Sequence, residues 1–241
     1  MRQFTTQNSY LRVLQRNHSF RKLWLGQVIS LFGDWFNLIA SAALIGQLSG
    51  SGMAVGGLFV LRMLAPFVVS PLAGVAADRL NRKYLLVASD LVRVFIVGGF
   101  LLVREPQDVG LLYGLTAIQL AISGFYYPAR NAILPDLVSK ADLGSANALL
   151  SVTWSSMLAF GAALGGLVSG RWGIYPAFMI DAATFLFSGF IVLLIPYHPP
   201  QTSAPNEKRV LTPVRDYLDG LKFLIRFPGV LMIAMQKGGL P

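Results

Sequence analysis

The stretch SANALLSVTWSSMLAFGAALGGLVS, residues 145–169, carries no charged side chain and is long enough to cross a lipid bilayer. A bilayer core about 30 Å thick needs roughly 20 apolar residues in a helix. Five more stretches meet that length: 23–47, 53–77, 84–103, 109–128 and 173–196. These segments are long and do not alternate polar with apolar residues, which favours helices over a β-barrel. The sequence therefore predicts an all-α membrane protein with six transmembrane helices.

The composition excludes both a soluble domain and a disordered chain. Hydrophobic residues make up 54% of the 241 residues and charged residues only 13%, whereas ordinary soluble domains carry about 25% charged residues. There is no cysteine, and His18 and His198 are too far apart in sequence to suggest a metal site. Neither a Gly-x-x-x-x-Gly-Lys-Ser/Thr phosphate loop nor a Gly-x-Ser-x-Gly nucleophile turn occurs. We therefore expect no enzymatic activity, no metal and no cofactor.

The net charge of +9 is distributed unevenly between the two sides of the predicted membrane domain. Of the 20 lysines and arginines, fifteen lie before the first stretch, after the second, after the fourth and after the sixth, and two lie in the opposite loops. Cytoplasmic loops carry an excess of Lys and Arg. The sequence predicts a multi-pass protein of the cell (inner) membrane with a cytoplasmic N-terminus. It does not predict a nucleic-acid-binding protein.

This pattern divides the chain into four parts. We expect a cytoplasmic N-terminal segment at 1–22 and a six-helix transmembrane bundle at 23–196. A cytoplasmic linker with a basic amphipathic helix is predicted at 197–228. Residues 229–241 are apolar but too few to span a bilayer, so they are interpreted as the start of a truncated seventh helix.

One motif lies in the short turn between the second and third stretches. It reads Gly74-Val-Ala-Ala-Asp78-Arg79-Leu-Asn81-Arg82-Lys83. This order resembles the Gly-x-x-x-Asp-Arg-x-x-Arg-Lys signature of the major facilitator superfamily of transporters. The resemblance implies that Gly74 allows a close helix approach, that Asp78 can sit near a helix N-terminus, and that the basic residues form a conformational latch.

Further motifs resemble one exporter branch of that superfamily, which includes bacterial enterobactin-type siderophore and macrolide efflux proteins. They are the segment from Asn17 to Ser30, Arg62-Met-Leu-Ala-Pro66, Ser89-Asp90-Leu-Val-Arg93, the segment from Tyr127 to Asp136, and Ala146-Asn147-Ala148-Leu149. The resemblance covers residues 10–228 and implies the N-terminal half of a twelve-helix fold, built as two three-helix repeats. It also implies alternating access, proton-coupled export, and a C-terminal six-helix half as partner.

A glycine motif in the fifth stretch resembles the antiporter sequence Gly-Pro-x-x-Gly-Gly. It contains Gly161, Gly165 and Gly166, with Ala162 in place of the proline. Glycines four residues apart also form a face on which helices pack closely. The sequence does not separate the antiporter interpretation from ordinary helix packing.

Five polar side chains within the apolar stretches are candidate cavity or proton-coupling residues. A charge near the bilayer centre costs roughly 3 kcal/mol unless it is paired or hydrated. At 1.5 Å per residue, three of the five charges or polar groups fall near mid-membrane depth: Asp34, Arg62 and Arg93. Asp181 lies in the sixth stretch, and Gln119 stands near the middle of the fourth, where antiporters carry an arginine. We expect Asp34 to face Arg62 or Arg93.

These observations predict a secondary transporter that exports an amphipathic small molecule of the drug or siderophore type, driven by proton entry. Two alternatives remain open. The protein could take up a solute instead, since direction is not encoded in these motifs. A chain with six spans could also be a truncated membrane scaffold that transports nothing.

Overall fold

The computed structural model describes residues 4–199, and every regular element in that range is a helix. The elements are α1 (Phe4–Arg16), α2 (His18–Ser49), α3 (Gly52–Arg79), α4 (Arg82–Phe100), the 3₁₀ helix η1 (Pro106–Asp108), α5 (Val109–Leu137), α6 (Leu143–Trp172) and α7 (Ile174–Leu193). The predicted all-α fold is confirmed. The linker predicted at 197–228 lies outside the described residues beyond position 199, and so does the seventh helix predicted at 229–241.

Two boundaries differ from the prediction by more than a turn. The N-terminal segment 1–22 contains α1, and α2 already begins at His18. α5 continues past Pro128 to Leu137, with Pro128 and Pro135 inside the helix. The added turns bury Ala129, Ile133 and Leu134 against neighbouring helices. This burial stabilises the longer helix despite its prolines.

Five segments of the described chain are long and apolar enough to cross a membrane. They are α2, α3, α6, α7 and Pro106–Leu137, which contains η1 and α5. The third predicted span, which corresponds to α4, is not among them because α4 carries Arg82, Lys83, Asp90 and Arg93 within 19 residues. Asp90 and Arg93 are buried where α4 packs against α5 and α7. The two charges near the middle of α4 therefore point into the bundle.

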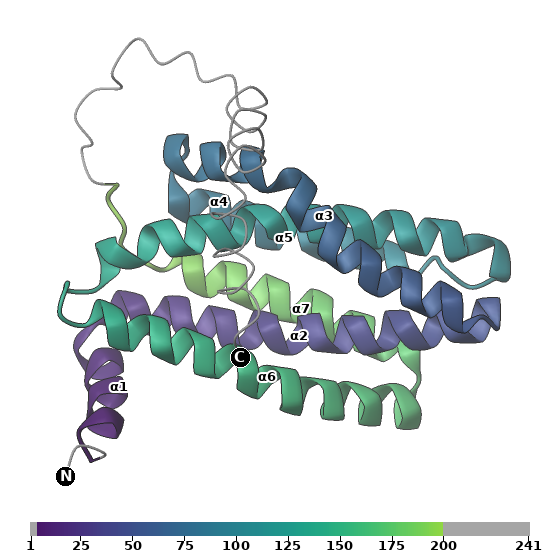
Figure 1. Ribbon diagram of the computed structural model, residues 1–241, viewed down its shortest axis with the longest axis horizontal. Helices are drawn as coiled ribbons and strands as arrows, with labels where there is room; N and C mark the ends of the chain where they lie inside the picture. The colour runs from purple at the N-terminus through teal and green to yellow at the C-terminus, as the bar shows by residue number, and fades with distance from the viewer. Residues whose placement is uncertain (1–3, 200–241) are drawn as a thin grey trace, which may run out of the picture. The chain divides into compact units, whose positions relative to one another are not determined.

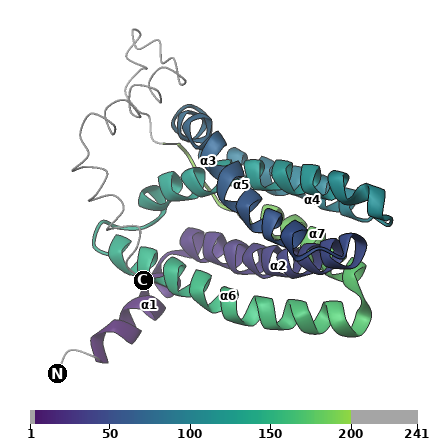
Figure 2. The ribbon, with the colours of Figure 1, turned by 45° about the vertical axis from the view of Figure 1, so that its right-hand side comes forward.

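Figures 1 and 2 show α3, α4 and α5 lying together on one side of the bundle and α2, α6 and α7 on the other. The most extensive contacts join α2 with α7, α3 with α5, α4 with α7, α2 with α6, and α4 with α5. The set is symmetric between the two halves of the bundle. When α2 is swapped with α5, α3 with α6 and α4 with α7, every contacting pair becomes another pair of the same set or stays the same. The contact pattern thus supports the predicted pair of three-helix repeats, α2–α4 and α5–α7.

Glycines set the spacing between α2 and its two main neighbours. A Cβ on Gly33 would overlap Thr184 Oγ1 on α7. A Cβ on Gly161 would lie 2.7 Å from Trp35 Cβ, and one on Gly165 would lie 3.2 Å from the Cα of Phe36. Side chains at these positions would push the helices apart, so the glycines allow the close approach. No atom of the described residues lies within 4 Å of a Cβ added to Gly166.

Candidate functional site

The middle of the bundle contains a cavity of about 250 Å³ between α2, α3, α5 and α6. Asp34, at the middle of α2, and Arg62 on α3 both line it. The remaining wall is formed by Leu31, Trp35, Pro66, Leu120, Ser123, Tyr127 and Trp154. The cavity thus combines one carboxylate and one guanidinium with aromatic surface, which suits an amphipathic ligand.

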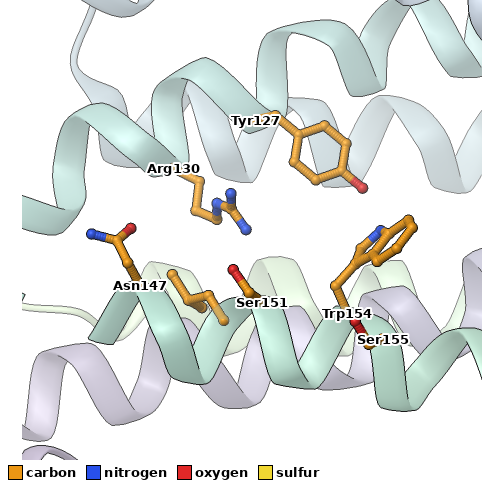
Figure 3. Close-up of a pocket in the computed structure, with 7 residues that line it drawn as sticks. Tyr127, Arg130, Asn147, Ser151, Trp154 and Ser155 are labelled. Carbon is orange, nitrogen blue, oxygen red and sulfur yellow. The ribbon is translucent and has the colours of Figure 1, made fainter. Parts of the chain in front are cut away.

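A second cavity of about 240 Å³ adjoins the first and shares Tyr127 and Trp154 with it. Figure 3 shows Tyr127 and Arg130 on α5 facing Asn147, Ser151, Trp154 and Ser155 on α6. Arg130 Nη1 donates a hydrogen bond to Gln27 Oε1 on α2 at 3.1 Å. The two cavities therefore extend the polar surface from Asp34 toward the end of α5 that carries Arg130.

Arg93 is the centre of a buried ion-pair network next to the first cavity. Its guanidinium is 2% exposed and donates to Asp90 Oδ1, while its Nη1 lies 3.9 Å from Asp34 Oδ2. Ser188 on α7 donates to the other oxygen of Asp90 at 2.8 Å. The rings of Phe185 and Tyr126 lie 4.2 and 4.8 Å from the guanidinium carbon. The expected proximity of Asp34 to Arg93 is present, but the closest partner of Arg93 is Asp90.

Asp181 and Gln119 lie away from the two cavities. Both are buried between helices, and neither lines either of the two cavities. Asp181 Oδ2 accepts a hydrogen bond from Asn37 Nδ2 at 2.9 Å, and the Gln119 side chain lies beside the carboxylate. Neither residue therefore contributes to these two cavities, and a role for them in proton coupling stays a prediction. A helical position at suitable depth does not specify which face of the helix meets the open space.

The turn of residues 74–83 forms contacts through only part of its predicted latch. Arg82 Nη1 lies 2.7 Å from Asp136 Oδ2 at the end of α5 and donates to the carbonyl of Ala132 at 3.1 Å. Tyr197, which follows α7, donates to the same oxygen of Asp136 at 2.8 Å. Partial burial, and secondly this hydrogen bond, raise the pKa of the Tyr197 hydroxyl to about 12, so it remains a donor at neutral pH.

Asp78 and Arg79 face away from the described bundle. Both are exposed in the last turn of α3, and neither forms an ion pair among residues 4–199. The N-terminus of α4 is capped by Asn81, whose side chain accepts from Lys83 N and Tyr84 N, rather than by Asp78. A Cβ on Gly74 would meet no described atom within 4 Å. The expected close approach at Gly74 is thus absent within the described part of the chain.

Three residues of the Arg93 network, the second cavity and the Arg82 ion pair are not among the predicted site residues. Asp90 lies three residues before Arg93, a helical spacing that brings side chains together and could have revealed the pair. Arg130 follows Tyr127 at the same spacing, but ending the helix at Pro128 places it in a loop. Asp136 is far from Arg82 in sequence, so no local pattern indicates that ion pair.

Comparisons with known proteins identify the family. Residues 23–236 match the Major Facilitator Superfamily. The chain is 32% identical over 213 residues to the uncharacterized MFS-type transporter YfiS of Bacillus subtilis (strain 168). The aligned region covers 87% of this chain and 50% of that protein.

Two further relatives are named as exporter or resistance proteins. The putative bacilysin exporter BacE of Bacillus subtilis (strain 168) is 26% identical over 83% of this chain and 49% of its own length. The multidrug resistance protein MdtG of Salmonella paratyphi C (strain RKS4594) is 29% identical over 80% of this chain and 47% of its own length. The chain spans about half the length of these curated relatives.

Proposed function

Because the chain belongs to the major facilitator superfamily, we propose that it exports an amphipathic small molecule by proton-coupled secondary transport. We further propose that it lies in the inner membrane with its N-terminus in the cytoplasm and works against a second six-helix half, with the substrate between the two. The names of BacE and MdtG, an exporter and a multidrug resistance protein, support export of a small drug-like compound.

The observation that carries this proposal is the position of Asp34. Its side chain is 21% exposed and lines the cavity, while Oδ2 lies 3.9 Å from Arg93 Nη1. Asp90 and Asp181 are 0% exposed. Among these three carboxylates, Asp34 is the one that a proton or a substrate in the cavity can reach.

The geometry suggests how a proton could change the bundle. Protonation of Asp34 removes its charge and weakens its attraction to Arg93, which links α2 to α4. Arg93 remains paired with Asp90, so the charge of the guanidinium stays compensated. The bond between α2 and α4 would thus loosen without leaving a buried charge unpaired.

The exposed residues of the turn have a separate role in this scheme. We propose that Asp78 and Arg79 act in the conformational switch through contacts with the second half, while Arg82 and Asp136 fix the turn to α5. Gly74 and Lys83 belong to the same switch motif. The absence of described neighbours around Gly74 leaves room for such a contact.

Everted vesicles containing the full-length protein test export and its coupling. Respiration acidifies their lumen, so a proton-coupled exporter should accumulate fluorescent amphipathic substrates, and nigericin should abolish the accumulation. Asp34→Asn should reduce accumulation to background while leaving equilibrium binding of the same compound within a few-fold and the folded yield unchanged.

Two controls make this result specific. Asp34→Glu keeps a titratable carboxylate and should retain part of the transport, and Glu105→Gln removes an acidic charge from an exposed loop and should transport normally. Nigericin-sensitive accumulation by Asp34→Asn would contradict the coupling role. Accumulation only in right-side-out vesicles would instead identify an uptake transporter.

A further inference from the structure

The second cavity is lined by polar faces of α5 and α6 that the transport scheme does not use. On α6, Asn147, Ser151 and Ser155 recur every four residues, and on α5 Arg130 follows Tyr127 by three (Figure 3). Residues at these spacings share one side of a helix. A polar face in a membrane helix is costly against lipid and is normally directed at water or a ligand. The two faces meet across the cavity, which indicates that it holds polar groups.

Arg130 carries a positive charge at this cavity that no carboxylate of the described residues neutralises. Its described hydrogen bonds go to neutral amides: Nη1 donates to Gln27 Oε1, and Nε and Nη2 donate to Asn131 Oδ1. A guanidinium has five N–H donors. Two of them, one on Nη1 and one on Nη2, are left after these three bonds. The surroundings thus orient Arg130 and leave donors for an anionic acceptor.

The charged residues that line the two cavities lie at opposite ends of the combined space. Arg62 and Asp34 lie at the mid-membrane end, and Arg130 lies at the other, beside Gln27. Gln27 precedes Asp34 by seven residues on α2, which corresponds to about 10 Å along the helix. Between the two ends, Trp35, Trp154 and Tyr127 supply aromatic surface, with the two indole centroids 6.2 Å apart. Two arginines and one aspartate give this lining a net positive charge.

We propose that Arg130, with the hydroxyl of Ser151 and the amide of Asn147, forms a subsite for the carboxylate of an amphipathic substrate. The apolar part of that substrate would lie on Tyr127 and Trp154. Arginine suits this role because its planar donors match the two oxygens of a carboxylate. This assignment rests on the proposed transport function and defines its substrate class as a carboxylate-bearing molecule with an aromatic or aliphatic body.

A matched pair of probes tests the subsite. Dansyl-phenylalanine carries a carboxylate, and dansyl-phenylalaninamide has the same body without the charge. Binding of each to the full-length protein in lipid nanodiscs is followed by dansyl fluorescence. A hydrogen bond to a charged group contributes about 1.5–3 kcal/mol, which corresponds to roughly tenfold or more in affinity. The wild type should therefore prefer the acid over the amide by about tenfold or more.

Arg130→Gln should remove this preference by weakening the binding of the acid, while the affinity for the amide stays within about twofold of the wild-type value. Arg130→Lys keeps the charge without the planar fork and should retain a reduced preference. Arg171→Gln removes the same charge from the exposed last turn of α6 and should leave both affinities unaltered. Because Arg130 has no ion-pair partner among the described residues, its replacement strands no buried carboxylate.

The outcomes separate this inference from the transport proposal. Equal affinity of the wild type for acid and amide, or equal weakening of both by Arg130→Gln, would overturn the carboxylate subsite. Failure of the wild type to bind either probe would also overturn it. Nigericin-sensitive accumulation of other amphipathic compounds in the everted vesicles would then still support export. Absence of accumulation for every compound, together with selective binding of the acid, would instead refute export and retain the binding site.

Discussion

At the scale of single residues, the buried arginine on α4 depends on two carboxylates that differ in their surroundings. Asp90 is fully buried, hydrogen-bonded to both Arg93 and Ser188, and separated from the cavities. Asp34 is partly exposed to a cavity and lies farther from the guanidinium. This difference makes Asp90 the closer compensation of the Arg93 charge, and it supports the proposal that Asp34 is the carboxylate that changes charge.

This division predicts opposite effects of the two carboxylates on stability. Asp90→Ala should destabilise the folded protein by about 3–5 kcal/mol because it leaves a buried charge without its nearest partner, whereas Asp34→Asn should change stability little. Thermal unfolding in detergent, followed by size-exclusion chromatography, measures both. The double variant Asp90→Ala with Arg93→Leu should recover most of the loss, since no unpaired charge remains. If Asp34→Asn proves as unstable as Asp90→Ala, the division is wrong.

At the scale of helices, the close packing of α6 against α2 depends on which side of α6 each glycine occupies. Gly161 and Gly165 contact Trp35 and Phe36 on α2, while Gly166 has no described neighbour at its Cβ position. Four residues separate the first two, so they occupy one face, and Gly166 lies about 100° from Gly165 around the helix. The glycine motif is therefore only partly a packing surface within this bundle.

Alanine substitutions at two glycines of this motif should affect stability differently, because only one of them contacts α2. Gly161→Ala places a methyl group 2.7 Å from Trp35 Cβ and should cost about 1–3 kcal/mol through forced displacement of α2 or α6. Gly166→Ala should leave the unfolding temperature of the protein unchanged or raise it slightly, because alanine favours the helix. Thermal scans of both variants in the same detergent test this. Equal loss for both substitutions would show that α6 is packed differently.

At the scale of the whole bundle, the alternation of helix direction gathers the basic turns at one end. The turns after α3 and α5 lie at the end where α1 meets α2, and the turns after α2, α4 and α6 lie at the other. Arg82 and Lys140 belong to the first group, and Arg104 and Arg171 to the second. This arrangement predicts the orientation of the bundle in the membrane.

The chain has no cysteine, so single thiols report this orientation without background. Lys140→Cys and Gln107→Cys both alter exposed turn residues. In intact cells, a membrane-impermeant maleimide should label Gln107→Cys and not Lys140→Cys, while permeabilised cells should show labelling of both. Labelling of Lys140→Cys alone in intact cells would reverse the proposed orientation.

Individual residues show why sequence reasoning places helices better than it places sites. The depth of Asp34 and Arg93 follows from counting residues along apolar stretches, and the structure does bring them within 3.9 Å. Counting does not give rotation about the helix axis: Asp181 has a plausible depth but lines neither of the two cavities. Ending the helix at Pro128 places Arg130 in a loop, whereas α5 continues to Leu137 and contains it.

The sequence alone determines the membrane location, the six helical stretches and the family, because hydropathy, charge asymmetry and local motifs are properties of short segments. The tertiary structure decides which helix faces meet: that Asp90 rather than Asp34 holds Arg93 most closely, that Arg82 pairs with Asp136, and that Arg130 faces α6 across a cavity. These contacts join residues far apart in the chain or depend on helix rotation. The Asp90–Arg93 spacing is local, but only the packed bundle shows that Asp34 lies farther from the guanidinium. The Arg82–Asp136 pair and the cavity between Arg130 and α6 join residues far apart in the chain, so no local pattern encodes them.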